Sequence, residues 1–254
     1  MTAARLTIAD PERALLAARG LDSFEALWSA AGTSVEAGNA ARGGSSTVAR
    51  LEIAGPEGTR RFYLKRQRNF NCRTLRHWLG GIPVAQREWR AIQALARQGI
   101  ATLEIAAYGR HHRRGDDRAL LLTRALEGYQ ELDAWLRAHP DRADHRRLAE
   151  AAGTLIAALH GAGWRHGCLY PKHLFIAQDF PQRSAGNPLR LIDLEKCKRI
   201  SRRHGGLRDL DTLFRHCPAL DTGLREQLLT SYLRGLGLSL DTRQLAGQVA
   251  RSKR

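Results

Sequence analysis

The spacing of the apolar residues changes its period about halfway along the chain, and this change limits the fold more than any other feature. In the first half, short stretches with strand-like alternation surround one amphipathic helix. The expected strands are residues 47–53, 61–65, 100–109 and 118–126, and the expected helix is residues 86–99. Gly55, Pro56, Glu57 and Gly58 predict a turn between the first two strands. A basic loop at residues 110–118 joins the last two strands, and we expect its His111 and His112 to lie in solvent. Because the next half is mostly helical in its spacing, we predict an α+β fold in which a small antiparallel sheet precedes a helical region.

The second half alternates long helices with two very short apolar strands. The expected helices are residues 146–163, 208–220 and 224–237, and the expected strands are residues 173–177 and 189–193. We place an N-terminal lobe at residues 1–124, with a helical extension at 1–32, and a helical C-terminal lobe at 125–254. In the extension, Asp22 is the expected N-cap of a helix because Glu25 follows it at capping-box spacing.

Composition excludes several protein classes. No apolar run reaches the roughly 18 residues of a membrane-spanning helix. Asp10 and Glu12 interrupt the stretch that a signal peptide would keep apolar, so we expect the protein in the cytoplasm. The four cysteines are far apart and form no C-x-x-C pair, which argues against a zinc ribbon or a disulfide framework.

The net charge of +16 indicates a partner that is anionic. Nucleic acid, an acidic lipid surface and a phosphorylated substrate all meet that description. The basic stretches at residues 61–76 and 196–208 contribute much of this charge.

Residues suited to phosphate and metal binding follow one another in a definite order. A glycine–serine stretch containing Gly43, Gly44 and Ser45 precedes the first two strands, and backbone N–H groups of such loops bind phosphates. Lys65 ends the second strand and can neutralise a phosphate, while Glu88 on the next helix can hold that lysine in place. Asp193 directly follows a short apolar strand and offers the hard oxygen that Mg²⁺ prefers.

These parts occur in the order of the protein-kinase fold, which has a glycine loop, a strand lysine, a helix glutamate, a catalytic loop and a metal-binding aspartate. More closely, the chain resembles the bacterial lipopolysaccharide core heptose kinase family, which includes Kdo kinases and InaA-like proteins. The resemblance runs from about residue 40 to about 216. It rests on the segments F-Y-L-K-R, G-G-I-P-V-A-Q-R-E-W-R-A-I, A-A-Y-G, H-G-C-L-Y-P-K-H-L-F and L-I-D-L-E-K.

The resemblance implies a two-lobed protein-kinase-like fold with ATP and Mg²⁺ as cofactors. It implies that a sugar hydroxyl of the lipopolysaccharide inner core is phosphorylated at the cytoplasmic face of the inner membrane. The positive charge suits this setting, because both the phosphorylated core and the anionic inner-membrane surface would attract the protein.

Individual roles also follow from the resemblance. Lys65 corresponds to the phosphate-binding lysine and Glu88 to its partner, with Gly43, Gly44 and Ser45 covering the phosphates. In the catalytic loop, His166 corresponds to the first position and is expected to brace the loop backbone. His173 and Asp193 correspond to the two metal-binding positions, and a further aspartate, Asp209, is expected to brace the catalytic loop from a buried helix.

One position departs from the family pattern. Established kinases of the family resemble ordinary kinases in carrying H-R-D at the catalytic loop, where this chain has His166, Gly167 and Cys168. A thiol with a reference pKa near 8.5 is a poor general base, and loss of a general base typically costs roughly 10²–10⁴ in rate. The imidazole of His173 is also a softer ligand than Mg²⁺ prefers.

Three functions from different classes therefore remain open on the sequence alone. The first is an active kinase of the lipopolysaccharide core type. The second, motivated by Cys168, is a catalytically impaired kinase-like protein with a regulatory or assembly role in envelope biogenesis. The third is a basic nucleic-acid-binding protein, which ranks last because the basic stretches have little aromatic interleaving and no recognisable nucleic-acid-binding motif.

Overall fold

The structure is a computed structural model of the chain, and it divides into two compact units. One unit comprises Met1–Ile92 and Leu103–Leu126, and the other comprises Gln93–Thr102 and Glu127–Arg254. The structure describes residues 4–35, 37–41, 43–74, 77–180, 182, 188–200, 206–239 and 241–251, with the backbone alone at 74 and 77–80. Parts of the two basic stretches, residues 75–76 and 201–205, thus lie outside the described residues.

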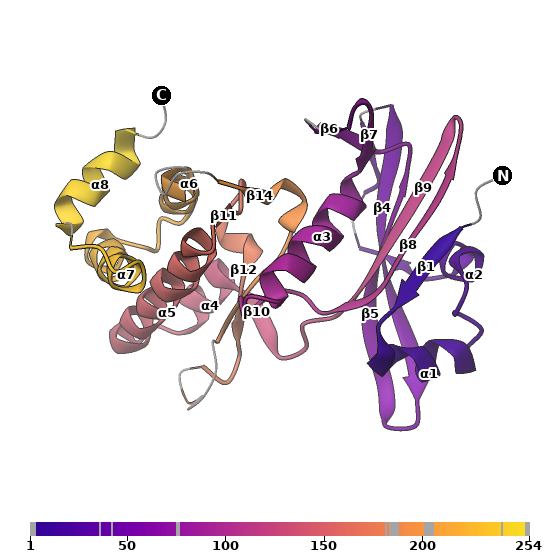
Figure 1. Cartoon of the computed structure of the whole chain (residues 1–254). Coiled ribbons are helices and arrows are strands. Elements are labelled where there is room, and N and C mark those ends of the chain that lie inside the picture. Colours follow the sequence, from indigo (N-terminus) through magenta and orange to yellow (C-terminus); the bar gives the residue numbers. More distant parts are fainter. Residues whose placement is uncertain are drawn as a thin grey trace. The chain divides into compact units, whose positions relative to one another are not determined.

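A seven-stranded antiparallel sheet forms the centre of the first unit (Figure 1). Its strands lie in the order β1-β8-β9-β5-β4-β2, and β3 pairs separately with β4. The strands are β1 (Arg5–Ile8), β2 (Thr33–Ser34), β3 (Asn39–Ala41), β4 (Gly44–Gly55), β5 (Gly58–Arg68), β8 (Ile105–Arg113) and β9 (Asp116–Arg124). The turn predicted at residues 55–58 is confirmed, since Gly55 pairs with Gly58 where β4 turns into β5. Both strands extend well beyond the predicted ranges.

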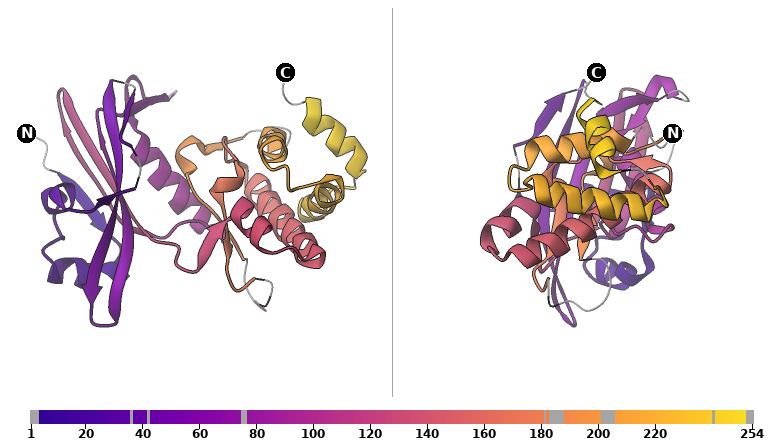
Figure 2. Two further views of the ribbon diagram at one scale, coloured as in Figure 1. Left: turned by 180° about the vertical axis from the view of Figure 1, so that it is seen from behind. Right: turned by 90° about the vertical axis from the view of Figure 1, so that its left-hand side faces the viewer.

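Helices cover both faces of this sheet. Helices α1 (Asp10–Ala18) and α2 (Phe24–Ser29) lie on one face, and α3 (Val84–Ala96) begins on the other (Figure 2). Side chains of β5 point alternately to the two faces of the sheet, which explains why helices pack on both. Phe62 and Leu64 are fully buried on one face, in the core that also contains Leu16 and Leu27 of α1 and α2. The next residue, Lys65, faces the opposite side, towards α3.

The N-terminal extension is an integral part of the sheet unit. Besides the expected helix, it supplies β1, which pairs with β8, and α1, whose buried Glu12 contacts Arg60 and Arg124 on the sheet. The predicted cap of α2 is wrong by one residue. Ser23 is the N-cap, because its hydroxyl oxygen accepts the backbone N–H of Ala26, whereas Asp22 does not cap the helix.

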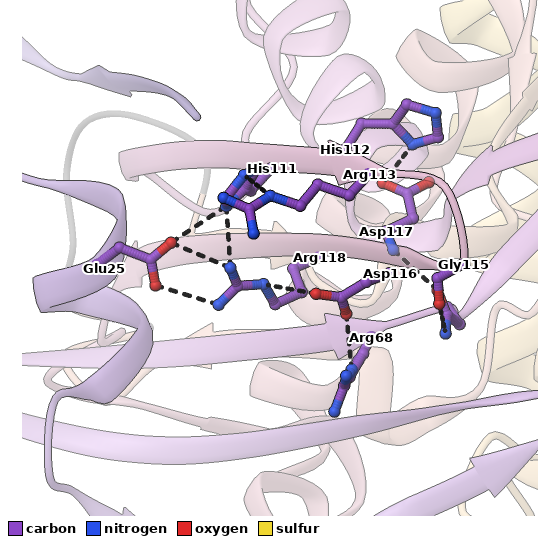
Figure 3. Close-up of polar contacts among 10 residues, drawn as sticks. Glu25, Arg68, His111, His112, Arg113, Gly115, Asp116, Asp117 and Arg118 are labelled. Atoms are coloured by element: carbon purple, nitrogen blue, oxygen red, sulfur yellow. Dashed lines mark hydrogen bonds and ion pairs between the residues drawn. The ribbon is translucent and has the colours of Figure 1, made fainter. Parts of the chain in front are cut away.

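The segment at residues 110–118, expected as an exposed basic loop, is the end of the β8–β9 hairpin. Figure 3 shows the polar network that orders it. His111 is buried, with Nδ1 3.1 Å from Glu25 Oε1, and its Nε2 accepts a hydrogen bond from Arg113. Asp116 pairs with Arg68 on β5, while His112 remains exposed as predicted. Alternating charges on neighbouring strands thus extend the hairpin where composition alone indicated a loop.

The remaining elements of the first unit lie between β5 and β8 in sequence. Strands β6 (Asn71–Thr74) and β7 (His77–Pro83) form a separate hairpin that leads directly into α3. Phe70, Cys72, Ile82 and Val84 form a small apolar cluster at its base.

The second unit is mainly helical, as expected from the spacing. Its helices are α4 (Leu132–Ala138), α5 (Arg142–Gly161), α6 (Leu207–His216), α7 (Thr222–Gly235) and α8 (Thr242–Arg251). Its short strands are β10 (Tyr129–Glu131), β11 (Trp164–Arg165), β12 (Leu174–Ala177), β13 (Leu189–Leu191) and β14 (Lys198–Arg199). The 3₁₀ turns are η1 (Pro171–His173) and η2 (Leu194–Lys196). No helix in the described part of the chain is both long enough and apolar enough to cross a membrane.

Two small sheets position the loops of the second unit. Strand β12 pairs with β10 on one side and β13 on the other, and β11 pairs with β14. Strand β13 ends at Leu191, two residues earlier than predicted. His173 lies in η1 and Asp193 precedes η2, so both predicted metal-binding residues occupy turns at strand ends.

Candidate functional site

Lys65 and Glu88 form an ion pair within the first unit. The ammonium Nζ of Lys65 on β5 lies 2.5 Å from Oε2 of Glu88 on α3. The side chain of Glu88 is only 3% exposed, while that of Lys65 is 19% exposed and therefore keeps some access to solvent. Glu88 shares the buried face of α3 with Ala85, Ile92 and Leu95, which explains how a carboxylate reaches the sheet. The predicted partnership is present in the structure.

Gln67 sets the position of α3 on the sheet, and sequence reasoning missed it. Its side-chain carbonyl accepts the backbone N–H of Ala85 in the first turn of α3 at 2.6 Å, and its amide donates to the hydroxyl of Ser46 on β4. Gln67 is 1% exposed and lies two residues beyond Lys65, on the same face of β5. That period of two, together with a polar residue in a buried strand, is the signal that could have identified it.

The glycine–serine stretch forms the turn between β3 and β4. Gly43 has a φ of +76°, and Ala41 pairs with Gly44, so Gly43 lies in the turn itself. A Cβ on Gly44 would lie 2.2 Å from the carbonyl oxygen of Arg68, so only glycine fits there. Ser45 is exposed and already pairs with Arg68 as a strand residue, which makes the turn shorter than the predicted loop.

In the second unit, Asp209 braces the catalytic loop. Its carboxylate accepts the backbone N–H of His166 at 2.6 Å and that of Gly167 at 2.9 Å, and Oδ2 also lies 3.2 Å from His160 Nε2. Burial alone would raise the pKa of Asp209, but the bond to His160, the charges of His160 and His166 and the Gly167 N–H together lower it. The contact expected for Asp209 is confirmed.

His166 joins the catalytic loop to the end of β13. Its ring is fully buried, and Nε2 lies 2.9 Å from the carbonyl oxygen of Ile192. Burial lowers the pKa of His166, so the ring is neutral and Nε2 carries the hydrogen that it donates to this carbonyl. The ring therefore braces the backbone, as the sequence indicated.

Asp193 occupies a left-handed backbone conformation, with φ +57° and ψ +56°. Such a conformation is uncommon for residues other than glycine, although aspartate and asparagine adopt it more readily than most, and strained residues cluster at functional sites. Oδ2 of Asp193 lies 3.2 Å from Nε2 of His173, which brings the two predicted metal-binding residues together. The carboxylate is one-third exposed, so it retains an open side.

Cys168 lies among these groups, with Sγ 3.5 Å from His166 Nδ1 and 3.9 Å from Asp193 Oδ2. Burial, reinforced by the negative charge of Asp193, raises the pKa of the thiol to about 12. The group is therefore a protonated thiol at neutral pH, and it cannot act as the base that an aspartate would provide.

Comparisons with known proteins agree with this arrangement. A model of the lipopolysaccharide kinase (Kdo/WaaP) family matches residues 25–232. Protein InaA of Escherichia coli K12 is 29% identical over 186 residues, which cover 72% of this chain and 82% of InaA. The lipopolysaccharide core heptose(I) kinase WaaP of Pseudomonas aeruginosa is 29% identical over 158 residues. That match covers 59% of this chain and 58% of the kinase, less than two thirds of its length.

A solved structure, WaaP in complex with acyl carrier protein, has a closely similar fold. The TM-score is 0.72 at 24% identity, over 97% of this chain and 95% of that chain. This likeness confirms the predicted α+β, protein-kinase-like fold.

Proposed function

This chain belongs to the lipopolysaccharide kinase (Kdo/WaaP) family, and we propose that it transfers a phosphoryl group from ATP to a sugar hydroxyl of the lipopolysaccharide inner core, of the heptose or Kdo type. The observation that carries the proposal is the Lys65–Glu88 ion pair. Burying a carboxylate is costly, and it is compensated here by one lysine whose ammonium keeps access to solvent. This arrangement suits a cation that must be held in one place to receive phosphate oxygens.

The residues of the second unit are suited to a divalent metal with ATP. Mg²⁺ is usually bound through one or two carboxylates together with phosphate oxygens and water. Asp193 offers such a carboxylate, held at a fixed position by the backbone after β13 and partly open to solvent. His173 fits Mg²⁺ poorly as a direct ligand, because imidazole is softer than oxygen ligands, and its suitable role is to orient the Asp193 carboxylate. Bound Mg²⁺ would neutralise charge on the transferred group.

The net charge supports an anionic acceptor and a place of action at the cytoplasmic face of the inner membrane. A charge of +16 would draw the chain to acidic leaflets and to a phosphorylated oligosaccharide. Loose transition states in phosphoryl transfer depend on positioning and charge more than on proton removal, so a kinase without a strong base remains chemically competent at a reduced rate.

A second candidate function is favoured by one observation, the buried thiol of Cys168 at the position where H-R-D has its aspartate. In this alternative the chain binds nucleotide without turnover and acts in regulation or assembly of envelope enzymes. Acceptor turnover separates the two functions, because the kinase must phosphorylate a lipopolysaccharide core acceptor and the impaired protein must not.

Thermal unfolding with and without Mg-ATP tests the nucleotide site first. Ligand at about one hundred times its dissociation constant stabilises a protein by roughly 2.7 kcal/mol, which is a rise of roughly 5–10 °C at this size. The variant Asp193→Asn should lose most of this rise, because asparagine tolerates the left-handed backbone but carries no charge. The exposed acid of the same unit, Asp179, provides the matched control as Asp179→Asn, which should keep the full rise.

The outcomes separate the proposals cleanly. A rise that Asp193→Asn removes, followed by phosphorylation of core oligosaccharide, supports the kinase. The same rise without turnover on heptose or Kdo acceptors supports the impaired kinase-like protein. Absence of any rise with Mg-ATP or Mn-ATP overturns both nucleotide-dependent functions.

A further inference from the structure

The catalytic loop and its surroundings bring a cysteine and two histidines together in the interior of the second unit. One ligand atom from each of His166, Cys168 and His173 lies within 4.8 Å of the other two. All three residues are buried, at 0%, 4% and 7% exposure. Asp193 adjoins the group through Oδ2, which is 3.2 Å from His173 Nε2 and 3.9 Å from Cys168 Sγ.

Hydrogen bonds to backbone carbonyls leave one nitrogen of each ring facing this group. Nε2 of His166 donates to Ile192, which leaves Nδ1 unprotonated and 3.5 Å from Cys168 Sγ. Nδ1 of His173 lies 2.7 Å from the carbonyl oxygen of Cys168. A carbonyl only accepts, so this nitrogen carries the hydrogen and Nε2 faces Asp193. Imidazoles that bind metals usually donate their outer N–H to a carbonyl or carboxylate in this way, which fixes the orientation of the ring.

Three separations between neighbouring ligand atoms are close to those of a tetrahedral metal centre. With Zn–S near 2.3 Å and Zn–N near 2.0–2.1 Å, neighbouring ligand atoms in a tetrahedron lie roughly 3.3–3.6 Å apart. The 3.5 Å separation lies within that range, the 3.2 Å separation is slightly shorter, and the 3.9 Å separation exceeds it by a few tenths of an ångström. One thiolate, two imidazoles and one carboxylate are ligands that zinc accepts and that magnesium does not prefer.

We propose that His166, Cys168, His173 and Asp193 form a binding site for a transition-metal ion, with Zn²⁺ as the ion that fits best. Formation of the Zn–S bond replaces the S–H bond of Cys168, and the displaced proton leaves to solvent. The site depends on cysteine at position 168, since the aspartate of H-R-D would supply no sulfur ligand. Metal binding here does not require the proposed kinase activity.

One consequence does rest on the proposed function. Zinc would occupy the Asp193 carboxylate that Mg-ATP needs, so zinc and Mg-ATP would exclude each other. Zinc availability would then regulate the kinase through the same cysteine that distinguishes this chain from the H-R-D pattern.

Cobalt substitution provides the direct test, carried out on the whole 254-residue chain without nucleotide. Co²⁺ titrated into metal-free protein should bind once per chain and give a thiolate-to-cobalt charge-transfer band with the intense visible bands of a tetrahedral ion. One equivalent of Zn²⁺ should abolish both. Cys168→Ser should remove the charge-transfer band and weaken Zn²⁺ binding by at least about tenfold. Cys72→Ala, which alters a buried cysteine of the first unit, should leave the charge-transfer band and the Zn²⁺ affinity unchanged.

Two further variants keep the test informative if serine perturbs the fold. Cys168→Asp retains an oxygen ligand, so it should bind cobalt without the charge-transfer band. His173→Asn should weaken the metal while leaving metal-free unfolding temperature close to the parent. A charge-transfer band that persists in Cys168→Ser, or Zn²⁺ affinity equal in the parent and in folded Cys168→Asp and His173→Asn, overturns the site. Neither result bears on whether Mg-ATP binds, which the thermal experiment above decides separately.

Discussion

The side-chain carbonyl of Gln67 accepts the backbone N–H of Ala85 at 2.6 Å, so a strand residue caps the helix that carries Glu88. Both residues are buried, and neither group has access to water as a replacement partner. The bond fixes the start of α3 against β5, the strand that also carries Lys65. The geometry of the ion pair therefore depends on a third residue that takes no direct part in it.

Replacing Gln67 by leucine should destabilise the chain by roughly 1–3 kcal/mol, because the Ala85 N–H would be left buried without a partner. The Mg-ATP dissociation constant should rise as well, since α3 would no longer hold Glu88 in place. Urea unfolding and nucleotide titration measure the two effects. Ser46→Ala removes only the weaker contact of Gln67 and serves as the control. Equal effects in the two variants would contradict the capping role.

Lys65→Met should lower the free energy of unfolding more than the simultaneous replacement of both partners of the ion pair. The single change leaves the Glu88 carboxylate buried without its cation, and breaking a buried pair this way costs roughly 3–5 kcal/mol, at the low end here because Lys65 is partly exposed. Lys65→Met with Glu88→Leu should recover much of that loss. A double-mutant cycle from urea unfolding gives the coupling free energy. Additive single effects would show that the two side chains do not interact.

Gly167→Ala should destabilise the catalytic loop beyond the ordinary cost of alanine in a left-handed conformation. Gly167 has a φ of +84°, and a Cβ there would lie 2.7 Å from the carbonyl oxygen of Lys196. Gly128 has a φ of +71° with open space around it. Gly128→Ala should therefore destabilise the fold only through backbone strain, by roughly 1 kcal/mol. Unfolding temperatures of the two variants isolate the clash, and a Gly167→Ala temperature as high as that of Gly128→Ala would refute it.

Stability should fall in acid partly through Asp117. Burial alone would raise the pKa of this carboxyl, but hydrogen bonds and charge from Arg110, with smaller contributions from Asn71 and His112, outweigh burial and lower it. A carboxyl whose folded pKa lies below its unfolded value stabilises the fold above about pH 4 and loses this contribution as pH falls through the folded pKa.

The urea midpoint, followed from pH 7 to below pH 4, checks this prediction. Asp117→Asn should lower the urea midpoint at neutral pH, and its midpoint should fall less steeply in acid than that of the parent. Asp10→Asn alters a side chain that is 94% exposed, and its acid decline should match that of the parent. An unchanged slope in Asp117→Asn would mean that other carboxyls account for the decline.

Cys168→Asp should raise phosphorylation of a core-sugar acceptor by roughly 10²–10⁴, the usual contribution of a general base. The carboxylate would replace a thiol whose pKa near 12 keeps it protonated. Radiolabelled phosphate transfer at saturating Mg-ATP measures the gain, and Cys217→Ser controls for loss of a buried cysteine elsewhere in the same unit. A lower rate in folded Cys168→Asp than in the parent would contradict the assignment of this position.

The sequence predicted best those features that one strand or one helix determines by itself. Glu88 was predictable because it lies on the regular helix that follows the strand of Lys65, and Asp193 because it closes an apolar strand. The 55–58 turn followed from glycine and proline chemistry. Each of these signals is local, so the period of the sequence and the turn residues suffice to detect it.

Features that depend on distant partners were missed or misassigned. His111 was predicted to be exposed, yet Glu25, more than eighty residues earlier, and Arg118 on the neighbouring strand enclose it. Gln67 gained its role from a helix eighteen residues away. At the hairpin end, β8 continues to Arg113 and β9 begins at Asp116, beyond the predicted ranges, because cross-strand ion pairs support polar sequences that strand propensity alone would end. At their other ends, β8 begins five residues later and β9 ends two residues earlier than predicted.

The pairing of β1 with β8 has a consequence for synthesis on the ribosome. Arg5 emerges first, but its partner Arg110 follows about 100 residues later, which is roughly 5–20 s at ordinary rates of translation. Through that interval the apolar side chains of α1, including Leu15 and Leu16, have no completed sheet to cover. The hydrophobic face of α1 therefore stays uncovered in the nascent chain until β8 and β9 are complete.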